Sequence, residues 1–160
     1  MTTTEAAFPA RDHNHDQCSS DALKRAEELC DQRAQKLTPT RRQVLEVLLS
    51  SHKPLGAYEI IDRAAKSGSR HAPVTVYRAL DFLIENGLAH RIESKNAFIG
   101  CVHRHADEDL VVFLICERCG EVGEAPSRAV AESLKEATRA AGFSPKAPVI
   151  EITGICANCR

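Results

Sequence analysis

The 160-residue sequence lacks the features that carry a chain into or across a membrane. None of its apolar runs approaches the ~18 residues that a membrane-spanning helix needs. Its opening residues, MTTTE, have neither the basic start nor the apolar core of a signal peptide. We therefore expect a soluble cytoplasmic protein, in which the seven cysteines favour metal binding over disulfides.

The sequence also lacks the signatures of a zinc-dependent hydrolase or deaminase. It contains no HEXXH motif and no H-x-E pair followed by PCxxC. An enzyme of this kind needs an open metal position with a general acid or base beside it. We therefore predict that the protein is not an enzyme.

A strong basic surplus is missing as well, since the formal net charge is −1. Residues 21–95 hold 13 Lys and Arg against 10 Asp and Glu, whereas the segments on either side are acidic. A surplus this small does not hold a polyanion by bulk attraction. Any binding of nucleic acid must therefore come from individually placed residues.

What the sequence does contain is two CxxC pairs, Cys116 with Cys119 and Cys156 with Cys159. Four thiolates at this spacing suit a closed, tetrahedral structural zinc site. The 36 residues between the pairs predict a folded unit whose two ends meet at the metal. Two redox-active CxxC motifs or four unrelated thiols are the alternatives, although nothing near either pair predicts a thioredoxin-like βαβ unit.

Apolar periodicity and cap residues predict several helices followed by a β-hairpin in the first two thirds of the chain. An apolar stripe that includes Cys30 runs through residues 21–37, and Thr38 caps a second helix that begins at Pro39. Further helices are expected at about 57–66 and 73–86, with strands at 88–93 and 97–102. This order indicates a winged helix-turn-helix, which places its last helix in the DNA major groove.

The last third predicts a small α/β unit, with strands near 111–115, 121–125 and 149–155 and a helix near 127–141. So few strands make a weak core, so we expect the sheet to pair with that of a second chain. The predicted fold class is therefore α+β, an N-terminal winged helix-turn-helix domain followed by a small C-terminal α/β dimerisation domain with a four-cysteine zinc site.

The predicted division of the chain has four parts. A disordered arm covers residues 1–20, a winged-helix DNA-binding domain 21–102, a hinge 103–110 and a dimerisation domain 111–160. The arm carries a cluster of possible metal ligands, His13, His15 and Cys18. A flexible segment loses conformational entropy when it gathers ligands, so we expect weak metal binding there at most.

From about residue 21 onward the chain resembles the ferric uptake regulator family, and most strongly its zinc uptake regulator branch. The motifs that carry the resemblance are LTPTR at 37–41, PVTVYRALDFL at 73–83, HRIES at 90–94 and FLICERCG at 113–120. The resemblance implies a homodimeric repressor of zinc-acquisition genes that binds double-stranded operator DNA when zinc is plentiful. It leaves open whether one dimer or two occupy an operator.

The resemblance also implies two zinc ions per chain, the structural ion and a regulatory one. Three regulatory ligands of the zinc branch match His90, Cys101 and Glu124. At the fourth ligand position, where that branch has a histidine, this chain has Asp109, and His105 followed by His103 are the next candidates. A ligand set that includes a thiolate is softer than the sets suited to iron or manganese, so it favours zinc. Such a site would bridge the hinge, and zinc would then bias the relative pose of the two domains.

The expected DNA contacts lie mainly on the helix near residues 73–86. Arg78 is placed to give guanine a two-donor contact, and Thr75 and Tyr77 can contact phosphate or a thymine methyl; a solvated helix face is the alternative. Tyr58 matches a DNA-contacting tyrosine of the zinc branch but is equally compatible with the core. Arg41 suits either a phosphate contact or a plain surface position.

Two other functions fit parts of the sequence. An iron or peroxide sensor of the same family would share the fold, but Cys101 argues against it. A thiol redox switch would use the CxxC pairs, and oxidation rather than zinc occupancy would then control DNA binding.

We predict that Asp109→Ala weakens zinc-dependent DNA binding and leaves the cysteine-bound zinc in place, because Asp109 is the first-ranked fourth ligand. Anisotropy of labelled operator DNA measures the binding, and metal analysis measures the retained zinc. His105→Ala is the matched variant. A normal zinc response in Asp109→Ala together with a lost response in His105→Ala reverses the ranking.

Overall fold

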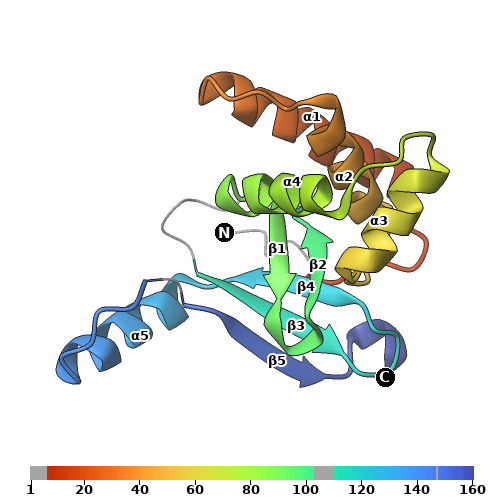
Figure 1. Cartoon of the computed structure of the whole chain (residues 1–160). Coiled ribbons are helices and arrows are strands. Elements are labelled where there is room, and N and C mark those ends of the chain that lie inside the picture. Colours follow the sequence, from red (N-terminus) through yellow and green to blue (C-terminus); the bar gives the residue numbers. More distant parts are fainter. Residues whose placement is uncertain (1–6, 103–109, 147) are drawn as a thin grey trace. The chain divides into compact units, whose positions relative to one another are not determined.

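The computed structural model of the chain describes residues 7–102, 110–146 and 148–160. These residues form two compact units (Figure 1). The helical unit comprises residues 12–102, and the sheet unit comprises residues 7–11 and the described residues from 110 to 160. In the part of the chain that is described, no helix is both long and apolar enough to cross a bilayer.

The first helix, α1 (His15–Gln32), begins inside the segment that was predicted to be a disordered arm. Asn14 caps it, because the Asn14 side-chain oxygen accepts a hydrogen bond of 3.0 Å from Gln17 N. Gln17 in turn donates to Asp21 at 2.8 Å, one turn further along. The prediction of disorder is therefore wrong for residues 15–20, because polar side chains rather than an apolar stripe start this helix.

The same helix ends earlier than its apolar stripe predicted. Ala34 adopts a left-handed backbone with φ of 51°, and Gln35 N donates to Cys30 O at 2.8 Å. These features turn the chain after Gln32, and Leu37 packs against the core from the connecting segment. Cys30 is buried as predicted, and burial raises the pKa of its thiol, which is typical of an inert core cysteine.

Three further helices complete the helical unit. They are α2 (Pro39–Leu49), α3 (Ala57–Lys66) and α4 (Pro73–Glu85). The Thr38 hydroxyl accepts a hydrogen bond from Arg41 N at the start of α2, and Gly87, with φ of 69°, ends the turn after α4. The inner faces of the four helices bury one continuous core, which is the main source of stability; its fully buried members include Leu45, Leu48, Ile60, Leu80 and Leu83.

A β-hairpin follows α4 and forms the wing. Strands β1 (Ala89–Ile92) and β2 (Ala97–Gly100) are antiparallel, and a 3-10 turn, η1 (Glu93–Lys95), joins them through Asn96. Leu55, in the connection between α2 and α3, exchanges two backbone hydrogen bonds of 2.8 Å with Phe98. The helical unit is therefore a winged helix-turn-helix, as predicted.

The sheet unit is a three-stranded sheet with one crossover helix. Its strands are β3 (Val111–Cys116), β4 (Val122–Pro126) and β5 (Ile150–Gly154), in the order β4-β3-β5. The central strand β3 is antiparallel to β4 and parallel to β5. A parallel neighbour requires a crossover connection, and α5 (Arg128–Ala140) provides it between β4 and β5.

Candidate metal centres and DNA-binding face

The parallel pairing of β3 and β5 brings the two cysteine pairs together. Cys116 is the last residue of β3 and lies opposite Gly154, the last residue of β5. Both strands therefore end at the same edge of the sheet. The chain after β3 turns tightly, because Gly120, with φ of 76°, donates to Cys116 O at 2.9 Å. After β5, the short helix η2 (Ala157–Cys159) forms the second turn.

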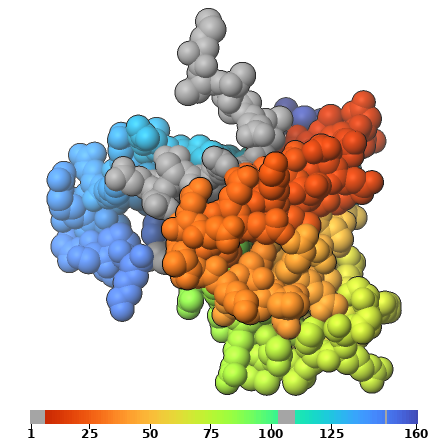
Figure 2. Space-filling view, turned by 90° about the horizontal axis from the view of Figure 1, so that it is seen from above, coloured from red at the N-terminus to blue at the C-terminus, as the bar shows by residue number. Residues whose placement is uncertain are grey.

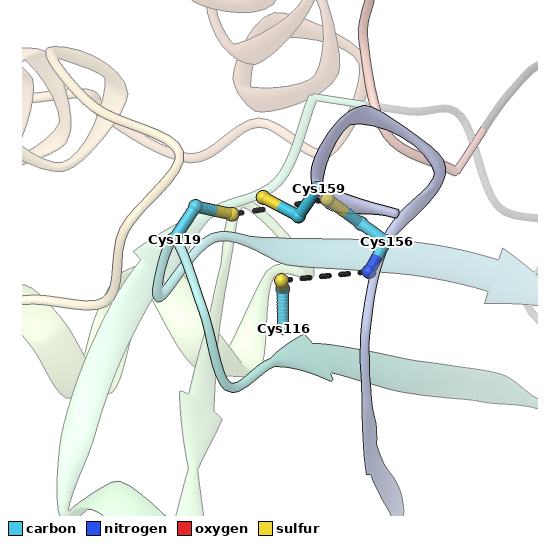
Figure 3. A group of neighbouring side chains, drawn as sticks. All are labelled: Cys116, Cys119, Cys156 and Cys159. Carbon is cyan, nitrogen blue, oxygen red and sulfur yellow. Dashed lines mark hydrogen bonds between the residues drawn. The ribbon is translucent and has the colours of Figure 1, made fainter.

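The four cysteine side chains point into one small space (Figure 3). All four sulfurs lie within 4.8 Å of one another, and Cys119 Sγ and Cys156 Sγ are 3.9 Å apart. Zinc–sulfur bonds of about 2.3 Å place neighbouring sulfurs of a tetrahedral site roughly 3.8 Å apart. The residues therefore fit a closed zinc site, which the CxxC spacing predicted.

Backbone N–H groups favour a thiolate at one of these positions. The N–H groups of Cys119 and Cys156 lower the pKa of the Cys116 thiol to about 6, and Cys156 N lies 3.4 Å from Cys116 Sγ. Burial instead raises the pKa of Cys119 to about 12 and also raises the pKa of Cys156. These backbone N–H groups thus favour the thiolate form of Cys116, which is the form in which sulfur binds metal.

A short N-terminal segment rests on the second cysteine turn. Asn158 Nδ2 donates a hydrogen bond of 2.9 Å to Pro9 O, and Phe8 packs against the cysteine cluster. Gly123 in β4 permits this approach, since a Cβ atom there would lie 2.6 Å from Ala7 O. Sequence reasoning missed the contact because this segment has no apolar period, although a glycine within a strand can mark a close backbone approach.

The wing presents two of the predicted regulatory ligands. Ala89 pairs with Gly100, and Cys101 N donates to Leu88 O at 3.0 Å, so Cys101 lies one step diagonally from His90 across the hairpin. Their potential ligand atoms are within 4.8 Å of each other, and both side chains are half-buried. A nitrogen and a thiol sulfur on one face of a hairpin suit a shared zinc ion.

The remaining predicted regulatory ligands lie outside the wing. Glu124 lies in β4 opposite Phe113, and its side chain is only 4% exposed. A buried carboxylate is uncommon, which sets Glu124 apart from the other acidic residues that are described in the sheet unit. Asp109 and His105, together with His103, lie outside the described residues, so the ranking among them stays a prediction.

The predicted DNA-contacting side chains lie mostly on exposed positions of the helical unit. Figure 2 shows the yellow-green residues around the start of α4 on the surface of the molecule. Arg78 is exposed, and none of the hydrogen bonds or ion pairs of the described residues engages its side chain. Tyr77 is 43% exposed and Thr75 is half-buried beside it. Tyr58 is 77% exposed, so it is not a core tyrosine.

Arg41 has contacts within the helical unit itself. Its guanidinium lies 3.6 Å from the centre of the Phe82 ring and donates to Lys36 O at 2.6 Å. Phe82 is buried in the core of the helical unit. Arg41 therefore covers an aromatic ring of the core, and its predicted DNA contact stays a prediction.

A further group of possible metal ligands lies in the helical unit. It joins His13 and His15, at the start of α1, with His52 from the connection between α2 and α3. Cys18, which the sequence grouped with the first two histidines, is not among its members. Sequence reasoning missed His52 because 36 residues separate it from His15.

A winged helix-turn-helix joined to a four-cysteine centre is typical of metal-binding transcription regulators. The model of the ferric uptake regulator family matches residues 32–153. The zinc uptake regulation protein of Escherichia coli (strain K12) is 35% identical over 141 residues, which cover 88% of this chain and 82% of that protein. The chain therefore belongs to the ferric uptake regulator family, as its motifs predicted.

Solved structures are similar over most of the chain. A zinc uptake regulator complexed with zinc and DNA is 34% identical with a TM-score of 0.79, covering 87% of this chain and 93% of that one. The crystal structure of holo XcZur is 41% identical with a TM-score of 0.79, covering 87% and 96%. These relatives confirm the predicted fold class.

We predict that Cys119→Ser releases the tightly held zinc and unfolds the sheet unit, because binding of a structural zinc is coupled to folding. Metal analysis and circular dichroism of the purified chain measure the two effects. Cys18→Ser removes a thiol outside the four-cysteine group, and we expect it to keep the zinc. Normal zinc content in Cys119→Ser would contradict the site.

Proposed function

We propose that the protein is a zinc-responsive transcriptional repressor. It binds operator DNA as a homodimer when its regulatory zinc site is filled, and it then represses genes for zinc uptake. The observation that carries the proposal is the pairing of His90 with Cys101 on the wing of a DNA-binding fold. The names of its relatives support zinc as the sensed metal and DNA as the partner.

The ligand chemistry supports zinc over iron. Cys101 supplies a soft thiolate, and His90 supplies an imidazole nitrogen. Glu124 and one residue of the hinge, Asp109 before His105, complete the proposed regulatory set. The four cysteines hold a second, structural zinc. The protein acts by binding rather than by catalysing a reaction, and it works in the cytoplasm, where operator DNA is.

The proposed switch depends on ligands from both units. The helical unit supplies the wing pair, and the sheet unit supplies Glu124. An ion that binds all of them is held best in one relative pose of the two units, so it stabilises that pose by its differential affinity. The repressor is active when this pose suits the operator.

Dimerisation is supported by apolar surface on the sheet unit. Large apolar side chains are exposed in the segment after α5 and along and just after β5, namely Phe143, Val149, Ile152 and Ile155. Exposed large apolar side chains are favourable material for an interface, and the sheet has too few strands to form a large core alone. A second copy of the chain satisfies both features, as the sequence predicted.

The test is a metal titration of DNA binding. Duplexes are first selected from a random library with zinc-loaded protein, and a labelled winner is then followed by anisotropy at fixed salt. The protein begins with only its cysteine-bound zinc and receives Zn²⁺, Fe²⁺ or Mn²⁺ in parallel. We expect only zinc to restore tight binding, because the thiolate-containing set selects it.

His90→Ala with Cys101→Ser is the variant for the same titration. It should lose the zinc response and keep the structural ion, since the four cysteines are untouched. Tight DNA binding before any metal is added, or a best response to Fe²⁺, would sink the proposal.

The proposed DNA face has its own test in Arg78. We predict that Arg78→Ala costs about 1–3 kcal/mol of DNA binding and relaxes the sequence preference at one base pair, because it removes a two-donor contact to guanine. Repeating the duplex selection measures the preference. Arg139→Ala removes the same charge from exposed α5 in the sheet unit and should leave the preference intact. An unchanged preference in Arg78→Ala would assign base recognition elsewhere.

A further inference from the structure

Three histidines from distant parts of the helical unit converge on one point. His13 precedes α1, His15 is its first residue, and His52 lies between α2 and α3. His52 Nε2 is 3.0 Å from His13 Nε2 and 3.2 Å from His15 Nδ1. All three side chains are half-buried.

Hydrogen bonding alone accounts poorly for this arrangement. An imidazole nitrogen carries either one in-plane lone pair or one N–H, so it makes one good hydrogen bond. His52 Nε2 nevertheless faces ring nitrogens of two other histidines at hydrogen-bond distance. One lone pair or one N–H is poorly matched to two such contacts, whereas a cation shared by the three rings accepts a lone pair from each.

The spacing fits a small divalent metal ion. Metal–nitrogen bonds of about 2.0–2.1 Å place neighbouring ligands of a tetrahedral site roughly 3.3 Å apart. The observed separations of 3.0 and 3.2 Å lie close to that edge, and all three ligand atoms are within 4.8 Å of one another. Three imidazoles suit Zn²⁺ and its neighbours Co²⁺, Ni²⁺ and Cu²⁺ and leave a fourth position for water.

We propose that His13, His15 and His52 form a third metal site, which binds a divalent ion of the zinc class with an exchangeable fourth ligand. The site differs in kind from the other two because it contains no thiolate and because all its ligands belong to the helical unit.

A metal ion bound at this site links the beginning of α1 to the connection between α2 and α3. The capped start of α1 already places His13 and His15 on either side of Asn14, so little backbone ordering is left for the metal to impose. We therefore expect this site to bind metal more tightly than the flexible cluster that was predicted from the sequence. A ligand that binds only the folded state stabilises that state, so metal raises the thermal stability of the helical unit.

Cobalt(II) is the probe that separates this site from the thiolate sites. The experiment uses the full chain with zinc in its four-cysteine site and the substitutions His90→Ala and Cys101→Ser. Added Co²⁺ should bind at about one equivalent per chain, with visible d–d absorption and without sulfur-to-cobalt charge-transfer bands. The thermal midpoint of the helical signal in circular dichroism should rise in parallel.

His52→Ala in this background should abolish both the d–d absorption and the thermal shift. His71→Ala is the matched control, since His71 lies in the same unit outside the three-histidine group and its Nε2 is 2.6 Å from Gln43 Oε1. It should keep both signals. His13→Ala and His15→Ala repeat the test at the start of α1, in case His52→Ala disturbs the fold.

The outcomes are distinct. Loss of the signals in the three variants, with retention in His71→Ala, supports the site. Co²⁺ absorption that survives in all three variants overturns it, as does a chain that binds no Co²⁺ in the starting background. Neither result bears on the zinc response of DNA binding, because that response depends on His90 and Cys101.

Discussion

The convergence of four sulfurs at one edge of the sheet is the constraint on which the sheet unit depends. Its strands are short, β5 is largely exposed, and α5 buries only Ala131. A core of this size gives little stability by itself. The parallel register of β3 and β5 brings their ends, and with them the two cysteine turns, to one edge of the sheet, where a shared metal ion holds them together. A structural zinc at the four cysteines thus supplements the small apolar core of the unit.

The helical unit is stabilised in a different way. Its four helices and the wing bury a continuous apolar core, and polar caps fix where α1 and α2 begin. The residues proposed to contact DNA lie outside this core, mostly at exposed positions of α3 and α4. Separate residues therefore stabilise the fold and are proposed to recognise DNA. Arg41 is the exception, because this predicted DNA contact packs over the core residue Phe82.

Local signals in the sequence were enough to predict α2, α3, α4 and the hairpin. Thr38, Pro39 and Gly87 act within a few residues of their own positions, so their effect is readable without a structure. The four-cysteine centre was also predictable, because the spacing within each CxxC pair can be read directly from the sequence. The start of α1 was not, since Asn14 and Gln17 form a polar cap where an apolar stripe was sought. His52 could not be assigned to the histidine group, because only the folded core brings it near α1.

The positions of the tyrosines determine which part of the protein its intrinsic fluorescence reports on. The chain has no tryptophan and two tyrosines, Tyr58 and Tyr77, and both are exposed on the helical unit. Its tyrosine fluorescence therefore arises entirely from the surface proposed to meet the operator, and none of it comes from the sheet unit. Tyrosine emission from the unlabelled protein consequently reports on that surface alone, whatever happens at the cysteine centre.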